Sequence, residues 1–261
     1  MNFGQQGVCT MRLSLTAATA ALLLPALSGA DTLGVRIGAN YWDYDISGTA
    51  RYKTKLSSND IDVNDELGYD NGNLGYFYVI LEHPVPFLPN VKISKTDIDE
   101  DANGVISQTV TYGNITFQAN EAVRSDVQLD QTDITLYYSV LDNVVNLDLG
   151  LNAKYIDSKG SITGAISGTE SADVSGWVPM AYAGVGVDLP FSGLSVSADG
   201  SYVTYQDSDF YDFTVRVTYS SPWRVGLDAG YRKIKLDLDD FDGSYADIEF
   251  DGPYAGLYLH F

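Results

Sequence analysis

The chain has 261 residues, of which 35 are acidic and 15 basic, and it carries a net charge of −20. This charge argues against nucleic acid as a partner, because phosphate binding needs a basic surface. After residue 30 the sequence contains no run of about 18 apolar residues, which excludes transmembrane helices from that region.

Residues 1–30 show the pattern of a secretory signal peptide. Arg12 precedes an uncharged, mostly apolar run over residues 13–27, and a small-x-small site ends at Ala30. We expect cleavage after Ala30, with residues 31–261 exported. Residues 1–10 lack signal character, so Met11 could be the true start.

The only cysteine, Cys9, precedes the expected cleavage site, so the exported chain would hold no disulfide. Because cleavage also removes Arg12, the exported chain would be more negative than the whole chain by a single charge. Such acidity favours solvated surfaces or binding of divalent cations.

Apolar and polar residues alternate in ten segments after the expected signal peptide, which predicts ten strands with two different faces. In chain order the predicted strands are 32–46, 74–82, one from residue 91 that ends near Asp97, 126–141, 146–156, 176–189, 194–205, 210–219, 223–238 and 247–261. In the ninth strand the apolar parity slips near Arg232 and Lys233, which predicts a β-bulge there.

The connections alternate between long and short. Residues 47–73, 98–125 and 157–175 are predicted as long loops and 239–246 as a final acidic loop, and 206–209 is a short exception. Residues 105–118 contain enough β-formers for a hairpin within the second loop. The tight connections are 83–90, 142–145, 190–193 and 220–222. This rhythm is typical of an all-β, antiparallel up-and-down barrel of the outer membrane, with short periplasmic turns and longer external loops.

The last strand ends in an aromatic residue, with Leu257, Leu259 and Phe261 on its apolar face. This ending resembles the signal by which the barrel assembly machinery of Gram-negative bacteria recognises its substrates. The alternative is an edge strand of a soluble sandwich.

Four phrases carry a wider resemblance: LEHPVPFLPNVK at 81–92, SGWVPM at 175–180, LPFSGLSV at 189–196 and ADIEFDGPYAGLYLHF at 246–261. They resemble a family of small proteobacterial outer-membrane β-barrel proteins, over residues 33–261. That family has no assigned activity, so the resemblance implies fold and location and leaves the function open.

If the apolar parity faces lipid, the other parity faces the lumen. The charged residues predicted there are Arg36, Glu82, Lys92, Asp148, Lys154, Asp188, Asp199, Arg216, Asp228 and His260. A narrow barrel can hold mixed charges only by pairing them, because unpaired buried charge is very costly. The alternative is a thin path for water or small ions. Aromatic residues near strand ends predict girdles at the two membrane interfaces, namely Tyr41, Trp42, Tyr138, Tyr155, Trp177, Tyr219 and Trp223.

A weak metal candidate lies in the second predicted loop. Asp99, Asp101 and Asn103 fit the opening of a calcium-binding loop, but Val110 stands where such a loop needs Glu. A solvated acidic loop is the alternative. The acidic loops could also share divalent cations with lipopolysaccharide phosphates. No other cofactor is expected.

Catalysis is not expected, because His83 and His260 are the only histidines and both fall at the predicted periplasmic end. The sequence therefore predicts an integral outer-membrane barrel with a structural or surface-interaction role. Its expected partners are outer-membrane lipid, lipopolysaccharide and the assembly machinery, and its oligomeric state is left open. A narrow channel for small solutes or ions is the alternative, and a barrel enzyme comes third.

Overall fold

The computed structural model describes residues 33–52, 60–85, 87–241 and 244–261, and the expected signal peptide and its cleavage site lie outside them. None of these described residues forms a helix long and apolar enough to cross a membrane. The chain folds into β-strands, which are β1 (Gly34–Tyr52), β2 (Ile61–Asp62), β3 (Asn71–Glu82), β4 (Asn90–Val105), β5 (Val110–Tyr112), β6 (Ile115–Phe117), β7 (Ala122–Asp142), β8 (Val145–Gly164), β9 (Gly168–Leu189), β10 (Leu194–Tyr205), β11 (Ser208–Ser220), β12 (Val225–Phe241) and β13 (Ser244–His260).

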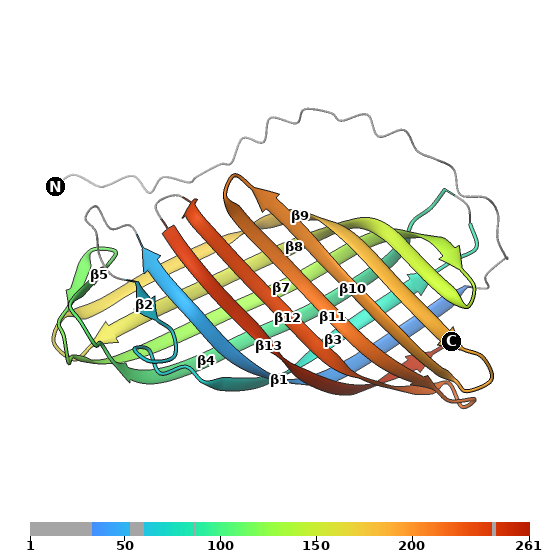
Figure 1. Ribbon diagram of the computed structural model, residues 1–261, viewed down its shortest axis with the longest axis horizontal. Coiled ribbons are helices and arrows are strands. Elements are labelled where there is room, and N and C mark those ends of the chain that lie inside the picture. Colours follow the sequence, from blue (N-terminus) through green and yellow to red (C-terminus); the bar gives the residue numbers. More distant parts are fainter. Residues whose placement is uncertain (1–32, 53–59, 86, 242–243) are drawn as a thin grey trace, which may run out of the picture.

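Ten of these strands form one closed antiparallel barrel, which confirms the predicted class and strand number (Figure 1). Each strand pairs with its neighbours along the chain, and β13 closes the wall against β1 from Arg36 opposite His260 to Tyr52 opposite Ser244. The short β2 pairs with β1, and β5 pairs only with β6. The β5–β6 pair is the hairpin predicted between residues 105 and 118.

The two ends of the barrel differ. We call one the terminal end, because Val35 and Phe261 meet there through backbone hydrogen bonds, next to the tight connections 83–89, 143–144, 190–193 and 221–224. We call the other the loop end. It carries the segment between β1 and β3, the segment between β4 and β7 that contains β5 and β6, and shorter connections near 165–167 and 206–207.

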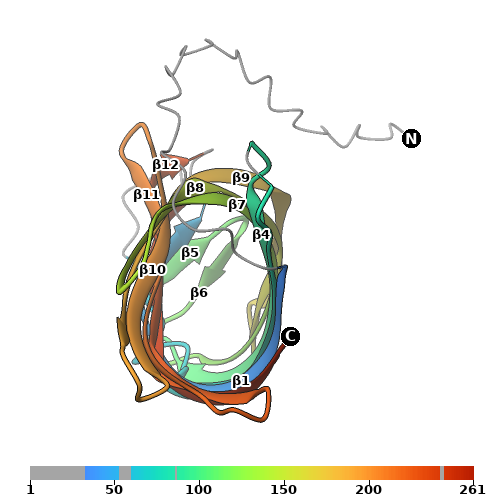
Figure 2. The ribbon, with the colours of Figure 1, turned by 90° about the vertical axis from the view of Figure 1, so that its right-hand side faces the viewer.

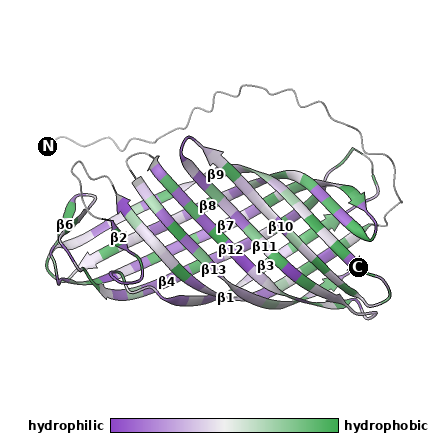
Figure 3. Cartoon of the chain, in the orientation of Figure 1, coloured by the Kyte–Doolittle hydropathy of each residue, from purple (hydrophilic) through white to green (hydrophobic). Residues whose placement is uncertain are grey.

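The outward-facing side of the wall changes character along the barrel. On β13 the outward positions read Leu259, Leu257 and Ala255 from the terminal end and then Asp251, Glu249 and Asp247 toward the loop end. Figure 3 shows the same shift, with hydrophobic colour concentrated on the half of the barrel that holds the C-terminus. The 17 residues of β13 would cover roughly 40 Å along a tilted barrel, against an apolar band of about 25 Å in this class. The loop end therefore has a length of wall with a hydrophilic exterior.

Inside the barrel the change runs the other way, from polar side chains near the terminal end to apolar side chains at the loop end. This change replaces the bulge predicted at Arg232 and Lys233 as the reason for the shift of apolar parity in β12. The pairing of β11 with β12 runs without interruption through both residues, and the register shift in β12 lies between Leu238 and Phe241. Arg232 and Ile234 both face inward and are buried. The apolar residues change from the outer to the inner face because the wall leaves the apolar band, so the strand needs no slip.

The same inversion explains why the loops predicted at 98–125, 157–175 and 239–246 were too long. The loop predicted at 47–73 is also shorter, because β1 continues to Tyr52. β4 continues through Asp97–Asp101 to Val105, and β8 and β9 stay paired as far as Gly164 opposite Gly168. β12 and β13 likewise pair up to Phe241 opposite Ser244. Polar residues face outward on these stretches and concealed the strand pattern, while Ile98 and Ile162 are buried inside.

Trp42, predicted as a girdle residue, also faces inward, where it is fully buried and donates its Nε1–H to the carbonyl of Gly252 at 3.1 Å.

Candidate functional site: the lumen

Apolar side chains fill the loop end of the lumen. The β1–β3 segment contributes Ile61, Val63 and Leu67, and the β4–β7 segment contributes Ile106, Val110 and Phe117, all of them buried. Figure 2 shows β5 and β6 within the outline of the barrel viewed along its length. We call these six residues the plug. They pack with inward residues of the wall, including Ile98, Val123 and Ile162.

Two buried glutamates tie the plug in place. Glu66 accepts hydrogen bonds from the backbone N–H of Asp62 at 3.0 Å and of Ser107 at 2.9 Å, which joins the two plug segments. Glu121 accepts from the backbone N–H of Ile166 and of Ser167, at 2.8 and 2.7 Å, and thereby holds the tip of the β8–β9 hairpin. Hydrogen bonds from the Ser167 hydroxyl and the Gln118 backbone hold the pKa of Glu121 at about 2.

An ion-pair cluster fills the middle of the lumen. The ammonium group of Lys154 on β8 is fully buried and lies 2.8 Å from Asp133 on β7 and 3.0 Å from Asp212 on β11. Arg232 on β12 pairs with the same Asp212 at 2.7 Å and lies 5.0 Å from the ring centre of Trp42. We call Asp133, Lys154, Asp212 and Arg232 the central cluster.

The sequence reasoning placed Lys154 in the lumen and missed the other three members. Asp133 and Asp212 share the inward parity of their strands, so alternation could have identified them. Arg232 was obscured by the supposed bulge.

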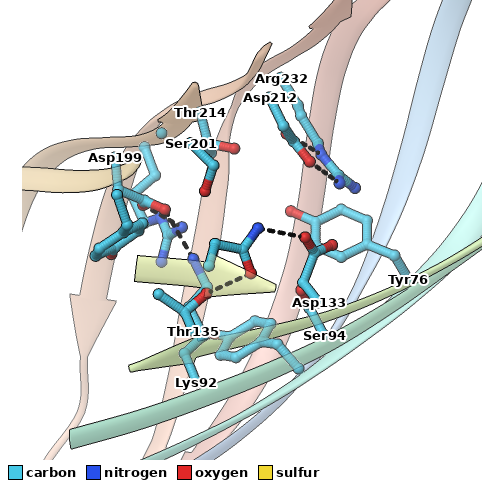
Figure 4. A pocket seen from close by; sticks show the side chains of 15 residues that line it. Tyr76, Lys92, Ser94, Asp133, Thr135, Asp199, Ser201, Asp212, Thr214 and Arg232 are labelled. Atoms are coloured by element: carbon cyan, nitrogen blue, oxygen red, sulfur yellow. Dashed lines mark hydrogen bonds and ion pairs between the residues drawn. The ribbon is translucent and has the colours of Figure 1, made fainter. Parts of the chain in front are cut away.

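A second ion-paired group lies nearer the terminal end. Asp199 on β10 accepts from Lys92 on β4 and from Arg216 on β11, each at 2.7 Å. These residues, with Tyr182, line two cavities of about 50 and 160 Å³. Figure 4 shows Lys92 and Asp199 in the smaller one, which reaches the central cluster at Asp133, Asp212 and Arg232.

Seven of the ten residues predicted for the lumen line the larger cavity, and these are Arg36, Glu82, Lys92, Asp148, Asp188, Asp199 and Arg216. The larger cavity lies at the terminal end, since its lining includes residues next to the tight turns. Of the other three, Lys154 belongs to the central cluster. Asp228 is buried and accepts hydrogen bonds from Tyr78 and Thr218. His260 packs beside the ring of Tyr258 at 5.8 Å between centroids.

The structure does not bring the predicted calcium ligands together in a loop. Asp99, Asp101 and Asn103 occupy alternate positions of β4, exposed on the outer face of the wall. Alternate positions on a strand stand about 6.6 Å apart in a row, which cannot surround an ion. Asp101 lies 3.4 Å from Arg124 instead. Among the described residues, no group of three or more His, Cys, Asp or Glu side chains could hold a metal ion.

Both histidines lie at the terminal end, far from the acidic exterior of the loop end. His83 is in the turn after β3, where its Nε2 is 3.1 Å from the carbonyl of Pro89. The residues of the proposed assembly signal, Leu257, Leu259 and Phe261, are exposed on the outer face of the barrel.

Comparison with known proteins bears on the fold. No family model matches the chain, and no curated protein matches it. Among solved structures, the outer membrane protease OmpT from Escherichia coli has a TM-score of 0.52 at 10% identity, and the match covers 87% of this chain and 97% of that one. The translocator domain of the autotransporter NalP from Neisseria meningitidis has a TM-score of 0.44 at 10% identity, covering 88% and 90% of the two chains. The similarity to OmpT, together with the closed antiparallel wall, shows that the chain has the fold of an outer-membrane β-barrel.

Proposed function

We propose that this protein is an integral outer-membrane barrel with a closed lumen, which acts as a structural or surface-interaction protein without catalysis. The observation that carries this proposal is the plug. Ile106 and Phe117 are fully buried within the loop end, where Glu66 joins the two plug segments and Glu121 holds the tip of the β8–β9 hairpin. The central cluster forms a second layer of ion-paired side chains behind the plug.

The distribution of residues on the outer face gives the proposed orientation. The apolar band lies near the terminal end, so the terminal end would face the periplasm and the loop end would project beyond the membrane. The projecting wall is acidic, with Asp97, Asp130 and Asp157 in one row across three neighbouring strands. A rigid acidic wall suits contact with cationic partners, or with lipopolysaccharide phosphates through shared divalent cations.

A narrow channel is the second candidate, because the two cavities adjoin at Lys92, Asp199 and Arg216. Single-channel recording of the refolded protein in a planar bilayer tests between the two functions, with heat-modifiable gel migration as the check on folding. A closed barrel predicts no conductance steps. Stable steps that change in size with Arg216→Ala would support the channel and contradict the closed barrel.

A surface role needs its own test. Purified protein in nanodiscs is compared with a variant carrying Asp97→Asn, Asp130→Asn and Asp157→Asn for calcium-dependent binding to immobilised lipopolysaccharide. The proposal expects binding that calcium increases and the triple variant loses. Equal binding by both proteins would contradict a role for this acidic row.

A further inference from the structure

The larger cavity at the terminal end contains three carboxylates that form no ion pair among the described residues. Glu82 accepts a hydrogen bond from the Tyr137 hydroxyl at 2.9 Å, and Asp148 accepts one from the Ser139 hydroxyl at 2.7 Å. Asp188 accepts one from the amide of Asn146 at 2.8 Å. All three donors are neutral, and each carboxylate has further acceptor capacity.

The same cavity contains three cationic side chains, of which only Arg36 is without an ion-pair partner among the described residues. Lys92 and Arg216 are both committed to Asp199, but Nε of Arg216 is buried and has no hydrogen-bond partner in the described structure. Arg36 forms no ion pair within the described ranges, and its guanidinium stands 4.8 Å from the ring centre of Tyr258. The Oδ1 of Asn146 is likewise buried without a partner there. The recess thus combines the unpaired guanidinium of Arg36 with carboxylates that have unused acceptor capacity.

Charges of both signs around one cavity favour a ligand that also carries both signs. A free ammonium group pairs with carboxylates, and a carboxylate pairs with a guanidinium, often through two hydrogen bonds. A ligand with only one of these groups would leave the opposite set unmatched. The volume of about 160 Å³ is small beside the pockets of drug-sized ligands, so the ligand must be compact.

We infer that this recess is a binding site for a small zwitterion of amino-acid size, entered from the terminal end. Arg36 binds the carboxylate of the ligand, and Glu82 and Asp148 bind its ammonium group. Entry is open because Glu82 and Asp188 are exposed and lie beside turns. The site goes beyond the proposed function, since a barrel that is closed at its loop end can still hold a solute from the periplasm.

Saturation-transfer NMR of the refolded protein in nanodiscs tests this inference, with L-alanine as the probe. We expect saturation transfer to L-alanine and a dissociation constant that rises roughly tenfold or more in Arg36→Gln and in Glu82→Gln, because each loses a charge-assisted contact. Glu82→Gln can keep the Tyr137 hydrogen bond and should fold. Lys159→Gln, an exposed position at the loop end, is the matched control and should bind like the unmodified protein.

Two further probes check that both charges are needed. Propylamine and propionate each carry one of the two groups, and each should bind more weakly than L-alanine. Absence of saturation transfer from a folded barrel, unchanged binding in both cavity variants, or equal binding of propylamine and L-alanine would each overturn the inference.

Discussion

The ammonium nitrogen of Lys154 lies 3.0 Å from Oδ2 of Asp212, although β8 and β11 are separated by two strands of the wall. This contact crosses the lumen and joins separate parts of the barrel wall. Lys154 also pairs with Asp133, and Arg232 forms a second ion pair with Asp212. The central cluster is therefore a brace inside the barrel.

Replacing Lys154 with Met should destabilise the protein strongly. The change leaves Asp133 without its cation in a buried site, and breaking a buried pair in this way costs about 3–5 kcal/mol. Asp212 keeps Arg232, so we expect a value near the lower end. Urea unfolding in phospholipid vesicles measures the change. The double variant Lys154→Met with Asp133→Asn should regain part of the loss, and a double variant no more stable than the single one would contradict the brace.

Glu121 should make the stability of the loop end depend on pH. Its folded pKa of about 2 is below the ordinary value of about 4.3 for glutamate. A depressed carboxyl pKa stabilises the fold at pH values above the unfolded pKa, and this contribution is lost as the pH falls from about 4.3 toward 2. Hydrogen exchange of residues 106–121 between pH 5 and 2.5 should show progressive loss of protection.

The Glu121→Gln variant provides the comparison for that measurement. Glutamine cannot titrate, so its exchange profile should depend less on pH, and it should already be less protected at pH 5. Identical pH profiles for both proteins would show that Glu121 does not hold the hairpin tip. Lys159→Gln is again a suitable control at the same end of the barrel.

Alternation along single strands was sufficient to predict the barrel, its ten strands and the inward parity of residues such as Lys154. The inversion at the loop end was missed because a strand outside the membrane has polar residues outward. Asp97 and Asp99 therefore indicated a loop although β4 continues through them.

Pairing across the lumen was beyond sequence reasoning. Lys92 and Asp199 are 107 positions apart and meet only because of the barrel's curvature and strand stagger. The plug was concealed for a similar reason. Ile61 and Phe117 stand in polar segments without a long apolar run, and their burial depends on the wall that surrounds them.

Neutralising Asp130 should stabilise the barrel. Asp130 on β7 stands directly opposite Asp97 on β4 and Asp157 on β8. Like charges in opposite positions of a sheet repel, and one such pair costs about 0.2–1 kcal/mol. Asp130→Asn should therefore raise the free energy of unfolding by about 0.5 kcal/mol at low salt, and by less at high salt because screening weakens repulsion.

Gln128→Asn, two positions along the same face, controls for a change in strand propensity. Lower stability of Asp130→Asn at low salt would contradict repulsion in this row.

Phe191 also costs stability, because of the backbone conformation that its turn requires. Its φ of 65° lies in the left-handed region, and its side chain is fully exposed at the terminal end. A non-glycine residue pays roughly 1–2 kcal/mol there, and part of the gain from glycine is offset by added freedom in the unfolded chain. Phe191→Gly should therefore raise the melting temperature in detergent micelles. In phospholipid vesicles the gain should shrink or reverse, because the ring would be lost from the membrane interface, where aromatic side chains bind favourably.

Phe191→Asn, which tolerates the same φ and also lacks the ring, should follow the glycine variant in vesicles. Equal gains in micelles and vesicles would show that the phenyl ring contributes nothing to membrane contact.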